Sequence, residues 1–210
     1  MLFASSPQEI LINLIVLGIG MTIHEFAHNY VGYQMGDPTP AQQGRLTLNP
    51  MVHINWVGWL MFAIIGFGIL GQAPISPSRM RNPRWGYLAA VAAGPLSNLL
   101  LAVVFAIPTR MLLGSVPVES FIFQFFYIGV FFNVLLFIFN LLPLYPLDGW
   151  HITYTLLPPD LAATWGSPQW RQYSQYAFFG LLLLSFSGLF NAFGLFISQP
   201  TFAIIRFLLG

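Results

Sequence analysis

The sequence predicts an all-α polytopic membrane protein, and three observations support this prediction. The 210-residue chain is 57% hydrophobic but only 6% charged, whereas charged residues make up about a quarter of a typical soluble domain. Its apolar residues form long runs separated by short segments rich in proline and glycine. Several runs are long enough to cross the ~30 Å hydrocarbon core of a bilayer as helices. No stretch is polar enough to form a soluble domain, so we expect residues 1–210 to form one membrane-embedded domain.

Four apolar runs are predicted to be full transmembrane helices. They cover about residues 8–35, 85–107, 121–144 and 176–197. The first follows the helix-start pair Ser6-Pro7 and precedes the helix-ending residues Gly36-Asp37-Pro38. At 1.5 Å per residue, its roughly 28 residues give about 40 Å, enough to span a bilayer with tilt. We expect the functional core over about residues 8–158 and a C-terminal apolar helix over about residues 174–197.

Two segments between the first and second helices are expected to differ from this pattern. Residues 42–54 include the alternating stretch Arg45-Leu46-Thr47-Leu48, which predicts a small β-hairpin-like element. Residues 56–70 are apolar but short, and they contain three glycines. This segment can either cross the membrane or enter it and return to the same side.

The arginines indicate which face of the protein is cytoplasmic. If residues 56–70 return to the same side, five of the seven basic residues lie on one face; these are Arg45, Arg79, Arg81, Arg84 and Arg171. The positive-inside rule then makes that face cytoplasmic. If the segment crosses fully, the arginines are nearly balanced and the rule decides nothing.

Composition excludes several classes of function. The net charge of +1 argues against nucleic-acid binding, and we expect the lipid bilayer to be the main surroundings of the chain. The chain has no cysteine, which excludes disulfides and thiolate metal sites. Any bound metal must therefore be held by histidine and carboxylate side chains.

The first apolar run contains the clearest chemical signal. His24-Glu25-Phe26-Ala27-His28 matches the pattern H-E-x-x-H. On a helix, residues four apart differ by about 40° in azimuth, so both imidazoles project from one face. They can bind one Zn²⁺, with Glu25 as the general base that activates water. The alternative is that these histidines only pack between helices, although ionisable residues inside a span are functional by default.

A catalytic zinc site usually has three protein ligands and one open position, so a third ligand is required. Asp148 is the strongest candidate, because it follows an apolar run directly, in Asn-Leu-Leu-Pro-Leu-Tyr-Pro-Leu-Asp-Gly. The two prolines break the helix and leave backbone groups that lipid does not tolerate unless they line a cavity. The alternative is a simple Asp-Gly turn. His53, Asp37 and Asp160 are expected in polar, solvated loops.

These two motifs, with Ala-Ala-Gly-Pro-Leu-Ser-Asn at residues 92–98 between them, resemble the site-2 protease family of intramembrane zinc metalloproteases. The resemblance covers about residues 18–152. It implies that His24, His28 and Asp148 bind one Zn²⁺ per chain and that Glu25 is the catalytic base. It also implies that Asn98 and Asn140 help to hold the substrate or the oxyanion. From the residues alone, Asn98 is equally well explained as a hydrogen-bonding bridge between helices.

The resemblance further implies regulated intramembrane proteolysis, in which peptide bonds are hydrolysed in or near the transmembrane segments of single-span membrane-protein substrates. We expect a multi-pass enzyme of a prokaryotic cell membrane, with its active site toward the cytoplasmic side. Two alternatives stay open: a non-catalytic scaffold that binds membrane helices, and a metal or proton transporter that uses the His/Asp cluster. Substrate identity, oligomeric state, and the roles of His53 and His151 do not follow from the sequence.

Overall fold

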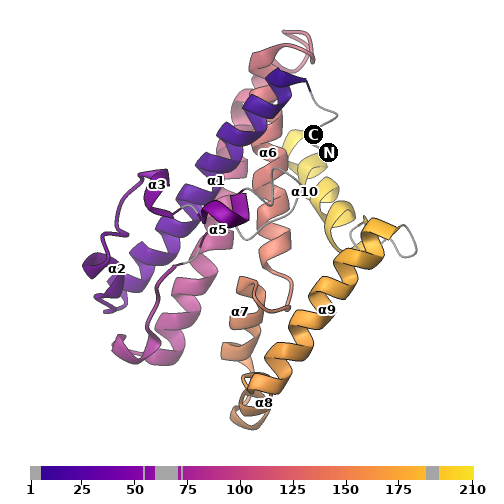
Figure 1. Cartoon of the computed structure of the whole chain (residues 1–210). Helices are drawn as coiled ribbons and strands as arrows, with labels where there is room; N and C mark the ends of the chain where they lie inside the picture. Colours follow the sequence, from indigo (N-terminus) through magenta and orange to yellow (C-terminus); the bar gives the residue numbers. More distant parts are fainter. Residues whose placement is uncertain (1–5, 54, 60–70, 72, 188–193) are drawn as a thin grey trace.

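The computed structural model describes residues 6–53, 55–59, 71, 73–187 and 194–210, and all regular secondary structure in these residues is helical (Figure 1). Three helices are long and apolar enough to cross a membrane; they are α1 (Pro7–Gln34), α5 (Pro83–Leu112) and α6 (Phe121–Asn140). The prediction of a multi-pass, all-α membrane protein is confirmed at this level.

The fourth predicted span differs from the helix found in its place. Helix α9 (Pro168–Ser187) begins earlier than the predicted run, and residues 188–193 of that run lie outside the described residues. The beginning of α9 is polar, and this helix is not among the three candidate spans. The C-terminal part continues as η3 (Gly194–Ser198), a π-helix, and α10 (Gln199–Leu209).

Local side-chain chemistry sets where the three long helices begin. Ser6 and Glu9 form a capping box at α1, because the Ser6 hydroxyl accepts from the Glu9 amide and the Glu9 carboxylate accepts from the Ser6 amide. Asn82 caps α5 and Ser120 caps α6 through side-chain oxygens that accept from the amides of Trp85 and Phe123. These bonds satisfy amides that no helical carbonyl can reach.

Helices α1, α5 and α6 pack side by side, and α10 lies against α6 (Figure 1). A buried apolar cluster joins α5, α6 and α10; its members are Ala102, Phe105, Ala106, Val130, Val134 and Ile205. Close approach of α5 and α6 depends on Gly129, because a Cβ at this position would lie 2.4 Å from the Phe105 ring. Small residues commonly allow such contacts between membrane helices.

The β-hairpin predicted at residues 42–54 is wrong for the part of this segment that the structure describes. Residues 42–53 contain no strand, and two short helices, α2 (Thr39–Gln42) and α3 (Pro50–His53), lie in or beside the segment. The Thr47 hydroxyl accepts from the backbone amide of Asn49, and the side-chain Oδ1 of Asn49 accepts from the backbone amide of Met51. Such local side-chain bonds offer the backbone an alternative to strand pairing. The predicted re-entrant segment falls largely on residues 60–70, which lie outside the described residues.

Asp37 is buried, contrary to its predicted place in a solvated loop. Its side chain is 0% exposed, and it accepts hydrogen bonds from the Thr39 amide, the Thr39 hydroxyl and the Ser76 amide. Ser76 immediately precedes η2 (Pro77–Arg79) and belongs to the chain that leads into α5. Asp37 therefore joins the end of α1 to this chain.

Irregular backbone separates α6 from α7 (Asp148–Leu156), as the proline spacing predicts. Helix α6 ends at Asn140, before the predicted end near residue 144. Two further helices follow α7, the short α8 (Pro159–Trp165) and the longer α9, and the stacked indole rings of Trp150, Trp165 and Trp170 connect the three helices. The break between α6 and α7 places Asp148 at the start of a new helix.

Replacing Gly129 by alanine tests the close contact of α5 and α6. We expect Gly129→Ala to destabilise the folded protein by about 1–3 kcal/mol, because the new methyl group overlaps the Phe105 ring. Thermal unfolding in detergent measures the change. Gly180→Ala is the matched control, since its Cβ meets nothing within 4 Å, and we expect it to be neutral or slightly stabilising. Equal stabilities of the two variants would contradict the predicted contact.

Candidate metal centre

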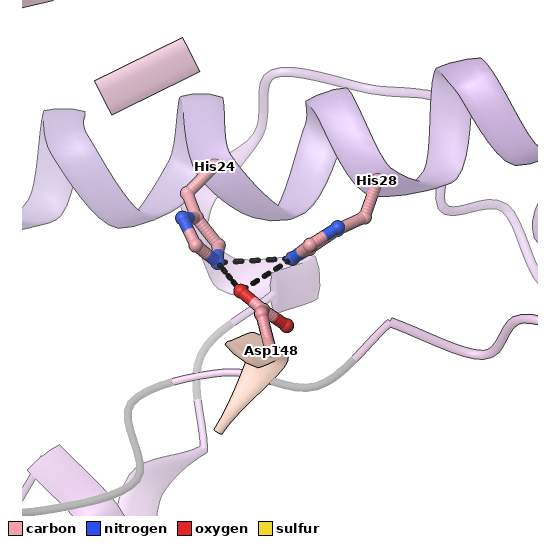
Figure 2. A group of neighbouring side chains, drawn as sticks. All are labelled: His24, His28 and Asp148. Atoms are coloured by element: carbon pink, nitrogen blue, oxygen red, sulfur yellow. Dashed lines mark hydrogen bonds and ion pairs between the residues drawn. The ribbon is translucent and has the colours of Figure 1, made fainter. Parts of the chain in front are cut away.

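Side chains from two separate helices meet at one point in the structure. His24 and His28 project from one face of α1, and Asp148 is the first residue of α7 (Figure 2). The Nε2 atoms of the two histidines lie 3.0 Å apart, and Asp148 Oδ2 lies 3.2 Å from His24 Nε2 and 3.3 Å from His28 Nε2. All three ligand atoms lie within 4.8 Å of one another. The predicted meeting of these residues is therefore present in the structure.

The hydrogen bonds behind each imidazole determine which atoms face the centre. His28 Nδ1 donates to the Ala90 carbonyl at 2.8 Å, and His24 Nδ1 lies 2.6 Å from Asn98 Oδ1. A carbonyl oxygen can only accept, so in each neutral ring the proton is on Nδ1 and the Nε2 lone pair points to the centre. Asp148 Oδ2 is buried and has no hydrogen-bond partner among the described residues.

Three lone pairs thus converge in a buried place, an arrangement that a cation stabilises. Two imidazole nitrogens and one carboxylate oxygen are a usual donor set for catalytic zinc, which keeps a fourth position open. Gly94 leaves space for the rings, because a Cβ there would lie 2.2 Å from His28 Nε2 and 2.8 Å from His24 Nε2. The residues present therefore fit a zinc ion.

Glu25 lies beside this group in a cavity of about 570 Å³. Its side chain is 3% exposed, and Oε2 has no hydrogen-bond partner within the described part of the chain. A buried carboxylate without a partner is costly, and general bases are held in this way when they must accept a proton from a bound water. His24, His28 and Asp148 line the same cavity.

Comparison with known proteins identifies this arrangement. Residues 110–185 match the family model described as "Peptidase family M50". The chain is 38% identical over 176 residues to "Putative zinc metalloprotease YwhC" of Bacillus subtilis, an alignment that covers 81% of the chain and 78% of that protein. The chain belongs to peptidase family M50, the site-2 proteases.

More distant M50 relatives occur in mycobacteria. "Putative zinc metalloprotease Rip2" of Mycobacterium tuberculosis is 28% identical over 148 residues, which covers 68% of the chain and 54% of that protein. Rip2 of Mycolicibacterium smegmatis is 29% identical over 155 residues, which covers 70% of the chain and 57% of that protein. No solved structure gives a significant match. The predicted family and its zinc metalloprotease activity are confirmed, and membership of M50 implies zinc.

The two predicted asparagines, Asn98 and Asn140, lie in different surroundings. Asn140, at the end of α6, lines the cavity, and its Nδ2 donates to the Leu136 carbonyl at 3.0 Å. Asn98 is buried behind His24 and does not line the cavity. Both hydrogens of its amide are used, since Nδ2 donates to the Gly20 carbonyl at 3.1 Å and to Asn133 Oδ1 at 3.0 Å.

The two histidines without a predicted role lie in different places. His53 is buried, contrary to its predicted place in a solvated loop, and it does not line the cavity; its Nε2 lies 2.8 Å from the Thr47 carbonyl. His151 is half-buried and lines the cavity. Its Nδ1 lies 2.9 Å from the Tyr87 hydroxyl. Helix α7 is not a candidate span, and burial lowers the pKa of His151 below its usual value, which favours the neutral ring.

Three further residues near the centre are not predicted by the sequence. Tyr87 and Arg171 line the cavity from α5 and α9, and Asn133 is fully buried on α6. None belongs to a local motif. Their positions follow from how separate helices pack, for which the sequence of one chain gives no direct signal.

A substitution at Gly94 tests whether the space beside the imidazoles is needed. We expect Gly94→Ala to lower zinc affinity at least tenfold, because the added methyl group overlaps the nitrogens of His24 and His28. Zinc content of the purified protein and competition with a chelator measure the effect. Gly180→Ala makes the same chemical change in open space and should bind zinc as the wild type does. Unchanged affinity in Gly94→Ala would show that the rings do not occupy these positions in the metal-bound protein.

Proposed function

We propose that this zinc metalloprotease hydrolyses peptide bonds in or near the transmembrane segments of single-span membrane proteins. The observation that supports the proposal is the position of the metal centre on α1, a buried site within a candidate membrane span. A substrate that reaches this site must itself enter the membrane. Of the three candidate roles (protease, helix-binding scaffold and transporter), the protease is favoured, because the M50 relatives are named as metalloproteases.

We infer that one Zn²⁺ binds per chain, held by His24 Nε2, His28 Nε2 and the Asp148 carboxylate. The support is the convergence of these atoms and the absence of another cluster of three possible ligands among the described residues. When bound, zinc supplies a Lewis acid that polarises the scissile carbonyl and makes water more acidic. The protein keeps both histidines in the tautomer that leaves Nε2 free.

Glu25 acts as the general base in this proposal. Its carboxylate accepts the proton of the attacking water and then gives it to the amine of the leaving peptide. The side chain suits this task, because it lines the cavity and one carboxylate oxygen has no protein partner within the described residues. The bond between the carbonyl carbon and the peptide nitrogen breaks. The hydroxyl of the water stays on the carbon and its proton moves through Glu25 to the nitrogen, so atoms and charge balance.

Asn140 and Asn98 are assigned different parts in the reaction. Asn140 lines the cavity and is the asparagine that can contact the substrate or the oxyanion. Asn98 was predicted to share this task, but its amide hydrogens are bonded to Gly20 and Asn133. Its contact with His24 supports a part in holding the imidazole.

We also propose that the active site opens toward the cytoplasm of a prokaryotic cell. The two histidine ligands lie in the second half of α1, toward the connection that leads to α5. Arg45, Arg79 and Arg81 belong to that connection, and Arg171 lines the cavity itself. The positive-inside rule places such a face in the cytoplasm, and the relatives named above are bacterial.

Substitution of the proposed base tests the function. We expect Glu25→Gln to retain zinc but to lose about 10²–10⁴-fold in the rate of cleavage of a single-span reporter, because the amide cannot accept the proton. Zinc content and reporter cleavage are measured on the same preparation in lipid or detergent. Glu9→Gln is a matched control outside the cavity and should cleave normally. Normal cleavage by Glu25→Gln would refute the assignment of the base.

The proposed topology can be tested with single cysteines, because the chain has none of its own. Gln43 lies between α1 and α5, and Ser115 lies between α5 and α6; both are exposed. In intact spheroplasts, an impermeant maleimide should label Ser115→Cys at once and Gln43→Cys only after permeabilisation. The reverse pattern would place the active site toward the outside of the cell.

A further inference from the structure

Behind the metal centre, one chain of hydrogen bonds passes through three helices. Asn133 of α6 accepts from Asn98 of α5, and Asn98 accepts from His24 of α1. Asn98 and Asn133 are 0% exposed, and His24 is also buried. Buried amides within a membrane bundle require partners for their donors and acceptors, and here the bonds between side chains form a chain that ends at His24.

Two backbone carbonyls fix the direction of this chain. The Gly129 carbonyl accepts from Asn133 Nδ2 at 2.8 Å, so the other side-chain atom of Asn133 that faces Asn98 must be oxygen. Asn98 Nδ2 donates to this oxygen at 3.0 Å and to the Gly20 carbonyl at 3.1 Å. The atom of Asn98 that remains for His24 is therefore Oδ1, at 2.6 Å from Nδ1.

This direction decides the state of the His24 ring. Because Asn98 offers an acceptor, His24 Nδ1 must donate, and the lone pair of Nε2 then faces His28 and Asp148. His28 obtains the same result from a backbone carbonyl, that of Ala90. A backbone carbonyl in a helix is fixed, whereas a side-chain amide can turn over and present its NH₂ group instead. His24 therefore needs a further residue that holds the Asn98 amide in place, whereas His28 does not.

We propose that Asn133 is a positioning residue of the metal centre, which holds the Asn98 amide in the orientation that prepares His24 to bind the ion. This inference rests on the proposed zinc site. The close fit of the neighbouring helix agrees with it, because a Cβ at Gly20 would lie 3.0 Å from Asn133 Oδ1. Groups that orient a metal-binding histidine usually change metal affinity by about 10–100-fold when they are removed.

A purely structural role would have a different signature. If Asn133 only joined helices, its loss would lower the stability of the bundle without changing the affinity of the folded protein for zinc. Thr109 provides the matched comparison, since it is also 0% exposed, lies on α5 and donates from its hydroxyl to the Phe105 carbonyl. It has no bond to the chain that ends at His24.

The experiment measures zinc affinity by chelator competition on full-length wild-type protein, Asn133→Leu, Asn133→Asp and Thr109→Val. We expect Asn133→Leu to bind zinc about 10–100-fold more weakly and to shift the visible absorption of the Co²⁺-substituted protein. Asn133→Asp, in its protonated form, still accepts from Asn98 and donates to Gly129, and it should regain most of the affinity. Thr109→Val should bind as the wild type does even if it melts earlier.

A double-mutant cycle tests whether Asn133 acts through Asn98. Asn98→Ala should weaken zinc binding, and adding Asn133→Leu to it should change the affinity little further. Additive losses, or wild-type affinity and cobalt spectrum in Asn133→Leu, would overturn the inference while leaving the zinc site intact. Failure of the wild-type protein itself to bind zinc at His24, His28 and Asp148 would instead refute the proposed function.

Discussion

The convergence of His24, His28 and Asp148 is the constraint on which much of this structure depends. Two imidazole lone pairs and a carboxylate oxygen face one another in a buried place. Each would be poorly placed without a cation, and the two histidines reach this point by a different structural feature from Asp148. The histidines need one helical turn, whereas Asp148 needs the break between α6 and α7.

The neighbouring helix α5 helps to position the two histidine rings. Because Gly94 has no side chain, α5 can lie close to the rings, and Ala90 of the same helix supplies the carbonyl that orients His28. One stretch of α5 thus provides both space and orientation. The Nδ1 groups of His24 and His28 and the side-chain amide of Asn98 are all hydrogen-bonded, which is the condition under which buried polar groups are tolerated.

The sequence predicts the elements whose signals are local and misses those that depend on packing. Hydropathy predicts α1, α5 and α6, the pair Ser6-Pro7 predicts where α1 begins, and the spacing of His24 and His28 predicts their shared face. The hairpin fails because Thr47 and Asn49 bond to nearby amides, a competition that strand alternation does not reveal. Asn133 lies in a phenylalanine-rich run with no motif around it, so only the packing of three helices shows what it contacts.

The buried bond between Asp37 and the Ser76 amide has a mechanical consequence. Ala73 and Ile75, just before Ser76, form part of the cavity wall, while α1 carries two of the three converging ligands. The bond of Ser76 to Asp37, three residues beyond the end of α1, therefore ties this part of the wall to the helix that carries the two histidines. Arg171 and Gln175 of α9 line the same cavity, and α9 is attached through the bond of Ser174 to the Tyr145 amide and through the stacked rings of Trp165 and Trp170. The spacing between this part of the wall and the histidines is therefore set by a contact in which α9 takes no part.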